Sequence, residues 1–234
     1  MHNPSSTTVV AFFVRVPVVG QVKTRLAAEL GAEGACRLYE AMVADILSNI
    51  KACALPLYLF HDGNAGAELP QAWVEASSEV RAQHGEQIGE RMAAAFEHCF
   101  AENISQVIMV GSDIPGLNAE IIDKASVALA SHDAAIAPVI DGGYCLIALK
   151  RERYHQRIFE DIPWSTDQVL RVTLNRFEEC KLAACLLQTM QDIDTIDDLN
   201  TYCRNPLPTA LATNRTLLGT LGKTPIAPKI WTNR

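Results

Sequence analysis

The alternation of hydrophobic and polar positions divides this chain into strands and helices that follow one another in turn. Predominantly apolar runs of strand length occur at residues 7–16, 55–60 and 107–110, and a shorter one lies near Val80. Such runs are typical of strands that are buried on both faces of a sheet. A similar run near residues 184–187 predicts a last strand.

Between these runs, apolar residues recur every four positions, as they do on one face of an α-helix. A helix is predicted over residues 34–52 by the row Leu38, Met42, Ile46 and Ile50. Asp45 falls near that apolar face, and we interpret it as a partner in an internal salt bridge. A second helix, beginning close to Gly85 and Gly89, is predicted by the row Ile88, Met92, Phe96 and Phe100.

The second half of the chain carries clear turn and cap signals. A helix is predicted over residues 118–130, with Asn118 as its N-cap. Apolar runs at 134–139 and 144–149 are joined by a turn with two glycines, which predicts a β-hairpin. Residues 165–168, S-T-D-Q, have the form of a capping box and predict a helix that continues to about Cys180.

A closing helix is predicted to start at the T-x-x-D segment of residues 195–198. From residue 205 onward Pro, Thr and Asn dominate and the periodicity is lost, so residues 205–234 are predicted to form a tail that is docked or mobile. The order of elements predicts an α/β fold: a mostly parallel, mixed sheet with helices on both faces, in one domain over residues 1–204.

Composition narrows the classes of function. The chain has 234 residues, of which 49% are hydrophobic and 20% charged, as in an ordinary globular protein. Acidic residues exceed basic ones by 27 − 20 = 7, and no Lys/Arg-rich run occurs. Nucleic acid and anionic membrane surfaces are therefore not expected as partners. A phosphate-bearing substrate would have to be held by a few local cations, backbone N–H groups or a metal.

The cysteines indicate a reducing compartment. Seven of them are scattered through the chain without a C-x-x-C pair, which argues against both a disulfide framework and a zinc site. The apolar stretch of residues 9–19 is interrupted by Arg15 and Pro17, and it is too short to span a membrane. These features predict a cytoplasmic protein.

Three loops that follow predicted strands carry residues suited to phosphate and metal. In residues 17–25, Gly20 allows close approach of the backbone, and Lys23 and Arg25 supply positive charge. Asp113 follows the strand at 107–110, where open α/β sheets place their ligands. The residues alone are also compatible with two solvated surface cations and with Asp113 as a turn or helix-cap residue.

The third loop carries Asp192 and Asp194 after the last predicted strand. Mg²⁺ and Mn²⁺ prefer oxygen ligands, often one or two carboxylates together with phosphates of the substrate. Two strand ends that bear carboxylates could therefore share one ion. Turn chemistry at the end of a strand is the alternative interpretation of this pair.

Six sequence blocks occur in one order and together resemble a known family. They are P-x-x-G-x-V-K-T-R-L (17–26), G-E-Q-I-G-E-R-M (85–92), G-S-D-I-P-G-L (111–117), D-G-G-Y (141–144), W-S-T (164–166) and D-I-D-T-I-D-D-L (192–199). The chain is similar over residues 8–200 to the uncharacterised bacterial glycosyltransferase-like family of GT-A fold, in the nucleotide-diphospho-sugar transferase superfamily. More distantly it resembles phospholactate guanylyltransferases and molybdenum-cofactor nucleotidyltransferases.

The resemblance implies a role for each matched position. Asp113, Asp192 and Asp194 would hold Mg²⁺ or Mn²⁺, with Asp113 also a catalytic residue. Asp141 is the second catalytic candidate, on the side where the acceptor would enter. The remaining candidates would bind the nucleotide or the second substrate: Gly20, Lys23, Arg25, Arg91, Ser112, Gly142, Gly143 and Tyr144.

These expectations amount to a metal-dependent transferase that uses a nucleotide-diphospho-sugar and a small acceptor. Many GT-A enzymes carry D-x-D at the metal-binding strand, whereas here the triplet is G-S-D at 111–113. A single aspartate there is the pattern of nucleotidyltransferases, which release pyrophosphate, and this is the alternative function. A nucleotide-binding module without turnover is a third. A homodimer is compatible with the sequence.

Overall fold

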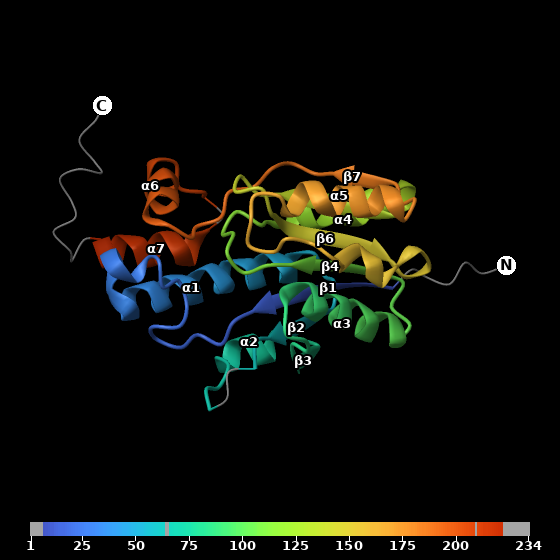
Figure 1. The fold of residues 1–234 in the computed structure, drawn as a ribbon. Coiled ribbons are helices and arrows are strands. Elements are labelled where there is room, and N and C mark those ends of the chain that lie inside the picture. Colours follow the sequence, from blue (N-terminus) through green and yellow to red (C-terminus); the bar gives the residue numbers. More distant parts are fainter. Residues whose placement is uncertain (1–6, 64–65, 209, 222–234) are drawn as a thin grey trace.

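A computed structural model describes residues 7–63, 66–208 and 210–221. Within this part of the chain one sheet forms the centre of the molecule (Figure 1). Its strands are β1 (Thr8–Val14), β2 (Leu57–His61), β3 (Glu79–Ala82), β4 (Gln106–Val110), β5 (Ala134–Pro138), β6 (Tyr144–Lys150) and β7 (Ala184–Leu186).

The predicted mixed sheet is confirmed. The strand order is β3-β2-β1-β4-β6-β5-β7. β6 runs antiparallel to both of its neighbours, β4 and β5, and the other pairs are parallel. The two-glycine turn at 142–143 produces the predicted hairpin, and the hairpin inserts β6 beside β4.

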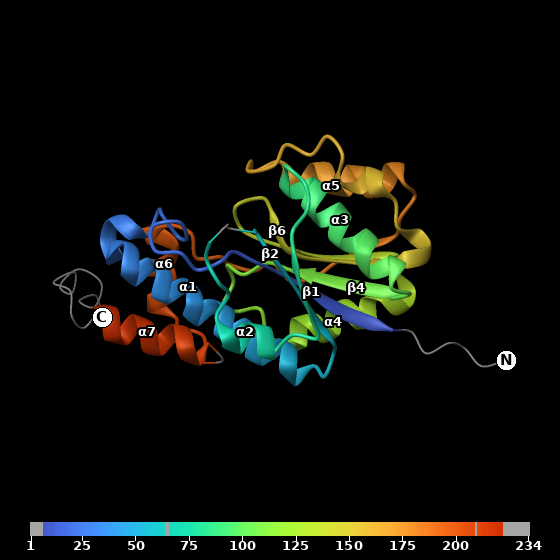
Figure 2. The same ribbon diagram turned by 90° about the horizontal axis from the view of Figure 1, so that it is seen from below.

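Helices cover both faces of the sheet. They are α1 (Ala27–Ala52), α2 (Gln71–Glu75), α3 (Ile88–Ala101), α4 (Ala119–Ser131), α5 (Val169–Glu179), α6 (Ile196–Arg204) and α7 (Leu211–Leu221), with short 3₁₀ helices at Arg151–Arg153 and Gln156–Phe159. In Figure 2, α3 and α5 lie on one side of the sheet, and α1, α4 and α7 lie on the other. No helix in the described ranges is long and apolar enough to cross a membrane.

The two apolar layers follow from the alternation of side chains along each strand. In β1, Val10 and Phe12 pack into the layer formed with α1 and α4, whereas Ala11 and Phe13 pack into the layer formed with α3. A strand with apolar side chains on both faces can be covered by helices on both faces of the sheet. The unbroken apolar run of β1 therefore accounts for its central place in the sheet.

One predicted helix start is wrong, and another helix has an additional first segment. α1 begins at Ala27, but its backbone is non-helical at Gly31, whose φ is +71°, so the helix predicted from about residue 34 corresponds to its second segment and residues 27–30 form the additional one. α5 begins at Val169, and Gln168 is its N-cap without a side-chain bond. The predicted capping box at Ser165 fails because this residue has a left-handed backbone, φ +64°, whereas a capping residue is extended. The caps at Asn118 and Thr195 are confirmed.

The predicted salt bridge of Asp45 is also replaced by another interaction. Its buried carboxylate accepts the backbone N–H groups of Ala212 and Thr213, each at 2.8 Å. These two residues lie in the first turn of α7, where unpaired N–H groups favour a carboxylate. The part of the predicted tail up to residue 221 is therefore docked on α1 (Figure 1), and residues 222–234 lie outside the described ranges.

Candidate functional site

Three loops meet at the carboxyl ends of β1 and β4. Lys23 belongs to the loop after β1, Asp113 to the loop after β4, and Asp194 to the segment between β7 and α6. The Lys23 ammonium nitrogen Nζ lies 2.7 Å from Asp113 Oδ1 and 2.6 Å from Asp194 Oδ1. One ammonium group thus ties together three segments that are far apart in the sequence.

The ion pairs are arranged with the cation inside and the anions outside. The Lys23 side chain is 4% exposed, whereas those of Asp113 and Asp194 are 50% and 42% exposed. Burial disfavours the charged form of Lys23, but the two carboxylates outweigh burial and raise its pKa. Lys23 therefore stays charged. Its backbone is left-handed, with φ +47°, a conformation that costs a non-glycine residue about 1–2 kcal/mol.

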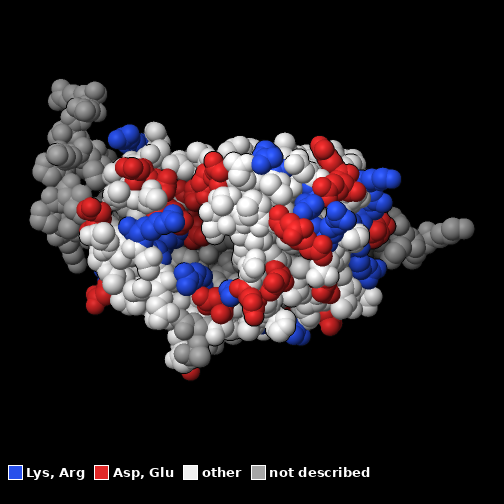
Figure 3. Space-filling model, in the orientation of Figure 1, with Lys and Arg blue, Asp and Glu red and all other residues white. Residues whose placement is uncertain are grey.

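These residues line a pocket of about 260 Å³. Its walls are formed by Arg15, Lys23, Thr24, Arg25, Tyr39, Asp113 and Asp194. On the face seen in Figure 3, Lys and Arg side chains meet Asp and Glu side chains beside a hollow between the α1–α6 side and the strand ends. A concave site that combines cations with carboxylates suits a ligand that carries phosphate together with a metal ion.

Tyr39, from α1, lines the pocket and holds two of the loops around it. Its hydroxyl accepts the N–H of Arg15 at 2.7 Å and lies 3.0 Å from Ser112 Oγ, to which it donates. Ser112 is buried. Its hydroxyl is therefore used to hold the loop after β4 against α1, and this places the neighbouring Asp113 at the pocket.

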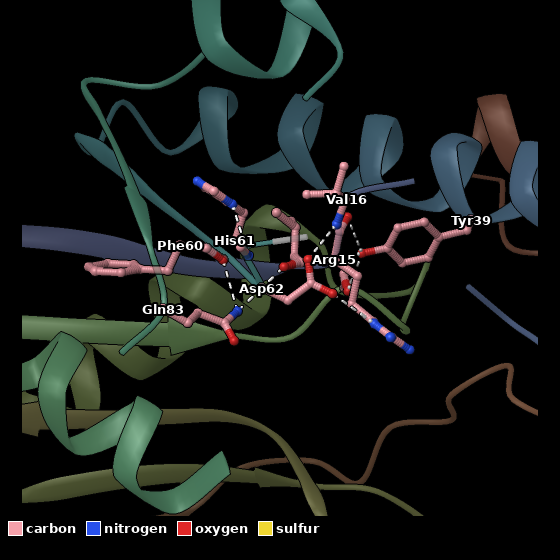
Figure 4. Close-up of polar contacts among 10 residues, drawn as sticks. Arg15, Val16, Tyr39, Phe60, His61, Asp62 and Gln83 are labelled. Atoms are coloured by element: carbon pink, nitrogen blue, oxygen red, sulfur yellow. Dashed lines mark hydrogen bonds and ion pairs between the residues drawn. The ribbon is translucent and has the colours of Figure 1, made fainter. Parts of the chain in front are cut away.

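Asp62 and Gln83 fix the ends of the first three parallel strands (Figure 4). The Asp62 carboxylate accepts the Val16 N–H at 2.9 Å and the Arg15 Nε–H at 3.1 Å. The amide Nε2 of Gln83 donates to the carbonyl oxygens of Phe60, at 3.0 Å, and of Val14. These bonds set the direction in which the chain leaves β1 towards Lys23.

A group of carboxylates lies beside the pocket. The pKa of Asp192 is raised to about 6, first by burial and then by the negative charges of Asp141, Asp194 and Asp198. Asp141 itself accepts the N–H of Gly143 at 3.0 Å. Acidic side chains this close repel one another, and a bound cation would relieve that repulsion.

The turn at 141–144 is packed tightly against the segment that precedes α5. A Cβ atom on Gly142, whose φ is +90°, would stand 2.3 Å from the carbonyl oxygen of Asp167. A Cβ on Gly89 would stand 2.6 Å from Trp164 Nε1, and the ring of Tyr144 packs edge-on against Trp164. The blocks at 85–92, 141–144 and 164–166 thus form one assembly, although they are distant in sequence.

The structure brings some of the predicted site residues together and separates others. Lys23, Arg25, Asp113 and Asp194 share the pocket, and Asp192 lies near Asp141. Arg91 instead donates to the carbonyl oxygens of Gly85 and Glu86 and holds the loop before α3. Gly20, Gly142, Gly143 and Tyr144 belong to the two loops described above. The roles of all these residues stay predictions.

Sequence reasoning missed four residues of the site: Arg15, Thr24, Tyr39 and Asp62. A charged residue at the end of a buried apolar run is the signal that points to Arg15. Tyr39 falls within a helical apolar row, where its hydroxyl is indistinguishable from an ordinary core contact. The role of Asp62 could be recognised only from the pairing of β1 with β2.

The donor set fits a divalent cation. Among the described residues, no three His, Cys, Asp or Glu side chains converge as a ready-made metal site. However, one oxygen each of Asp113 and Asp194 converges on a single point, which Lys23 Nζ occupies. Two carboxylates together with phosphate oxygens and water are a common set for Mg²⁺. Asp192 is a third carboxylate nearby.

Comparison with known proteins gives a family and a fold. Residues 46–166 match a family described as "Uncharacterized protein conserved in bacteria (DUF2064)". No curated protein matches the chain. A protein of Desulfovibrio desulfuricans G20, provisionally assigned as a nucleotide-diphospho-sugar transferase, is 30% identical; the match covers 92% of this chain and 96% of that one, with a TM-score of 0.83.

Two more distant structures share the fold alone. A cytidylyltransferase from Leptospira borgpetersenii is 11% identical, with coverage of 97% and 98% of the two chains and a TM-score of 0.55. Glucosyl-3-phosphoglycerate synthase from Mycobacterium tuberculosis is also 11% identical, with coverage of 93% of this chain and 81% of that one and a TM-score of 0.54. The fold is therefore that of nucleotide-diphospho-sugar transferases and nucleotidyltransferases, as the sequence blocks imply.

Proposed function

The chain belongs to the bacterial family DUF2064, and on this premise we propose that it is a transferase that uses a nucleotide-diphospho-sugar as donor. The observation that carries the proposal is the buried Lys23 ammonium held between Asp113 and Asp194, in a pocket that also presents Arg25. The 30% identical protein that is provisionally assigned to such transferases supports it.

The pocket suits a diphosphate. Arg25 is exposed on its wall, and its planar guanidinium can donate two parallel hydrogen bonds to phosphate oxygens. Lys23 supplies a second positive charge. In a chain with seven more acidic than basic residues, three cations that line one pocket, Arg15, Lys23 and Arg25, are a local exception. Lys23 and Arg25 would hold the donor and stabilise the negative charge that builds up on its diphosphate as it leaves.

The metal ion proposed here is Mg²⁺ or Mn²⁺, held by Asp113 and Asp194 with Asp192 beside them. When bound, it would supply Lewis-acid stabilisation of the departing diphosphate. Asp141 lies next to Asp192, at the turn that packs on residue 167. We assign Asp141 as the general base, whose carboxylate would accept the proton of an acceptor hydroxyl.

A nucleotidyltransferase is the second candidate, and one observation favours it. Gly111 occupies the position at which a D-x-D triplet ending at Asp113 would add another carboxylate, and the side chain of the intervening Ser112 is buried in a hydrogen bond with Tyr39. The loop after β4 therefore presents a single aspartate to the pocket. Such an enzyme would attack the α-phosphate of a nucleoside triphosphate and release pyrophosphate.

The Asp113→Asn variant tests whether the pocket binds nucleotide with a metal. We expect calorimetry to show metal-dependent binding of nucleoside diphosphates by the wild type and its loss in the variant, because the change removes the charge and keeps the shape. Asp197→Asn is the matched control, since Asp197 is exposed and lies outside the pocket. Equal metal-dependent binding by wild type and Asp113→Asn would reduce Asp113 to a structural residue.

A further inference from the structure

Lys23 occupies the point at which the two carboxylates of the pocket converge. Its Nζ is 2.7 Å from Asp113 Oδ1 and 2.6 Å from Asp194 Oδ1, and both are charge-assisted hydrogen bonds. Only 4% of the Lys23 side chain is exposed, so water does not replace these contacts. The ammonium is thus the resident counter-ion of this carboxylate pair.

An ammonium neutralises the pair only in part. Two carboxylates carry two negative charges and Lys23 carries one positive charge, so the group keeps a net charge of −1. A divalent cation would bring it to zero. Mg²⁺ requires oxygen ligands at about 2.0–2.1 Å, which is closer than the N···O separations of the ion pairs, and leaves no space for Nζ between the same oxygens.

A divalent cation bound to the other oxygens of the two carboxylates would still compete with Lys23. It would lie beside the Lys23 ammonium, and two positive charges that are so close repel each other strongly in a partly buried site. We propose that Lys23 holds the place of the divalent cation, and that the ammonium leaves the Asp113–Asp194 pair when the metal binds. The inference rests on the proposed function only in taking Mg²⁺ or Mn²⁺ as the ligand.

The released side chain has a place to go. The pocket it lines also carries Arg15 and Arg25, and a lysine side chain is long and freely rotating. A diphosphate in the pocket gives the ammonium new partners. Metal and diphosphate therefore bind cooperatively: the metal frees Lys23 for the phosphates, and the phosphates compensate Lys23 for its lost carboxylates. Such coupling is reciprocal, so each ligand strengthens the other by the same factor.

Chemical labelling of the wild-type protein tests the exchange without any risk from misfolding. Lys23 is acetylated slowly as long as its ammonium is buried, whereas the exposed Lys51 serves as an internal reference. With Mg²⁺ or Mn²⁺ present, mass spectrometry should show labelling of Lys23 increased at least about fivefold and that of Lys51 unchanged. Metal binding with Lys23 still protected would overturn the proposal.

Two variants test the competition directly. Lys23→Gln should bind Mn²⁺ about tenfold more tightly than the wild type in calorimetry without nucleotide, because the competitor is gone. Arg25→Gln removes the same unit of charge from the same pocket without touching the carboxylate pair, and should change Mn²⁺ affinity by no more than about twofold. Equal gains in the two variants would show that Lys23 acts through net charge alone and would sink the exchange.

These results are independent of turnover. Release of Lys23 by metal without cleavage of any donor would leave the exchange standing and remove the proposed function. Cleavage of a donor while Lys23 stays protected would support the proposed function and overturn the exchange.

Discussion

At the scale of the single residue, Arg25 is the cleanest probe of phosphate binding. It lines the pocket, is exposed and makes no ion pair within the described ranges. Arg25→Ala should weaken binding of a nucleoside diphosphate by about 1.5–3 kcal/mol for each charged hydrogen bond made, and leave the uncharged nucleoside unaffected. Calorimetry with both ligands measures this, and an unchanged melting temperature confirms the fold. Equal losses for both ligands would contradict a role in phosphate binding.

Lys23 shows how far a sequence can define a single residue. The K-T-R-L block identifies it as a cation near phosphates, but the ion pairs with Asp113 and Asp194 were not predictable. Asp194 lies 171 positions further along the chain, and only the sheet order brings the two together. The left-handed backbone of Lys23 has no signal in the residue type, since glycine is the usual occupant.

At the scale of the element, Asp45 holds α7 on α1. The carboxylate accepts two N–H groups of α7, so Asp45→Ala should leave them unsatisfied and lower the free energy of unfolding by about 2–3 kcal/mol. Asp45→Asn keeps an acceptor oxygen and should lose less. Chemical denaturation measures both changes. A loss within about 0.5 kcal/mol for Asp45→Ala would mean that apolar packing alone docks α7.

The turn between β5 and β6 gives a second prediction at this scale. Gly142→Ala adds a Cβ against the backbone of Asp167 and strains a φ of +90°, so we expect a loss of about 2–3 kcal/mol in stability. Gly66→Ala is the control, because its φ is +91° but its Cβ would meet open space. That variant should lose about 1 kcal/mol, from backbone strain alone. Similar losses at both sites would show that contact with residue 167 is unimportant.

Elements were predictable where the local signal agreed with the surroundings. The T-x-x-D segment at 195–198 forms a reciprocal capping box as expected, because Thr195 is extended and Asp198 reaches back to its N–H. The similar S-x-x-Q segment at 165–168 does not, because the chain there packs under Gly142 and turns with a positive φ at Ser165. Tertiary contacts that decide such cases are invisible in a window of four residues.

At the scale of the whole molecule, the order of strands and helices was the most predictable feature. Apolar runs of strand length allow burial on both faces, and the two-glycine turn requires an antiparallel neighbour. The fold then brings the carboxyl ends of the parallel strands to one edge, and with them Lys23, Asp113 and Asp194. The bond that this edge acts on does not follow from the fold, because sugar transfer and nucleotidyl transfer both use a bound nucleotide and a metal.

The identity of the broken bond separates the two enzymes. In sugar transfer the anomeric C–O bond breaks and an intact nucleoside diphosphate leaves; in nucleotidyl transfer the α–β phosphoanhydride breaks and pyrophosphate leaves. We expect the protein, incubated with Mg²⁺ or Mn²⁺ and a panel of nucleotide sugars, to release free nucleoside diphosphate, with water replacing an absent acceptor. Nucleoside triphosphates with pooled small phosphorylated acids form the parallel assay.

The Asp113→Asn variant makes the outcome specific to the pocket. Release of nucleoside diphosphate that disappears in this variant and persists in Asp197→Asn is the expected result, because only Asp113 of the two faces Lys23. Pyrophosphate that depends on Asp113 would instead identify a nucleotidyltransferase and agree with Gly111 in place of a second carboxylate. If neither product forms although nucleotide binds tightly with metal, the pocket holds nucleotide without turning it over. The charges that bind a diphosphate do not by themselves position an acceptor at the reacting carbon.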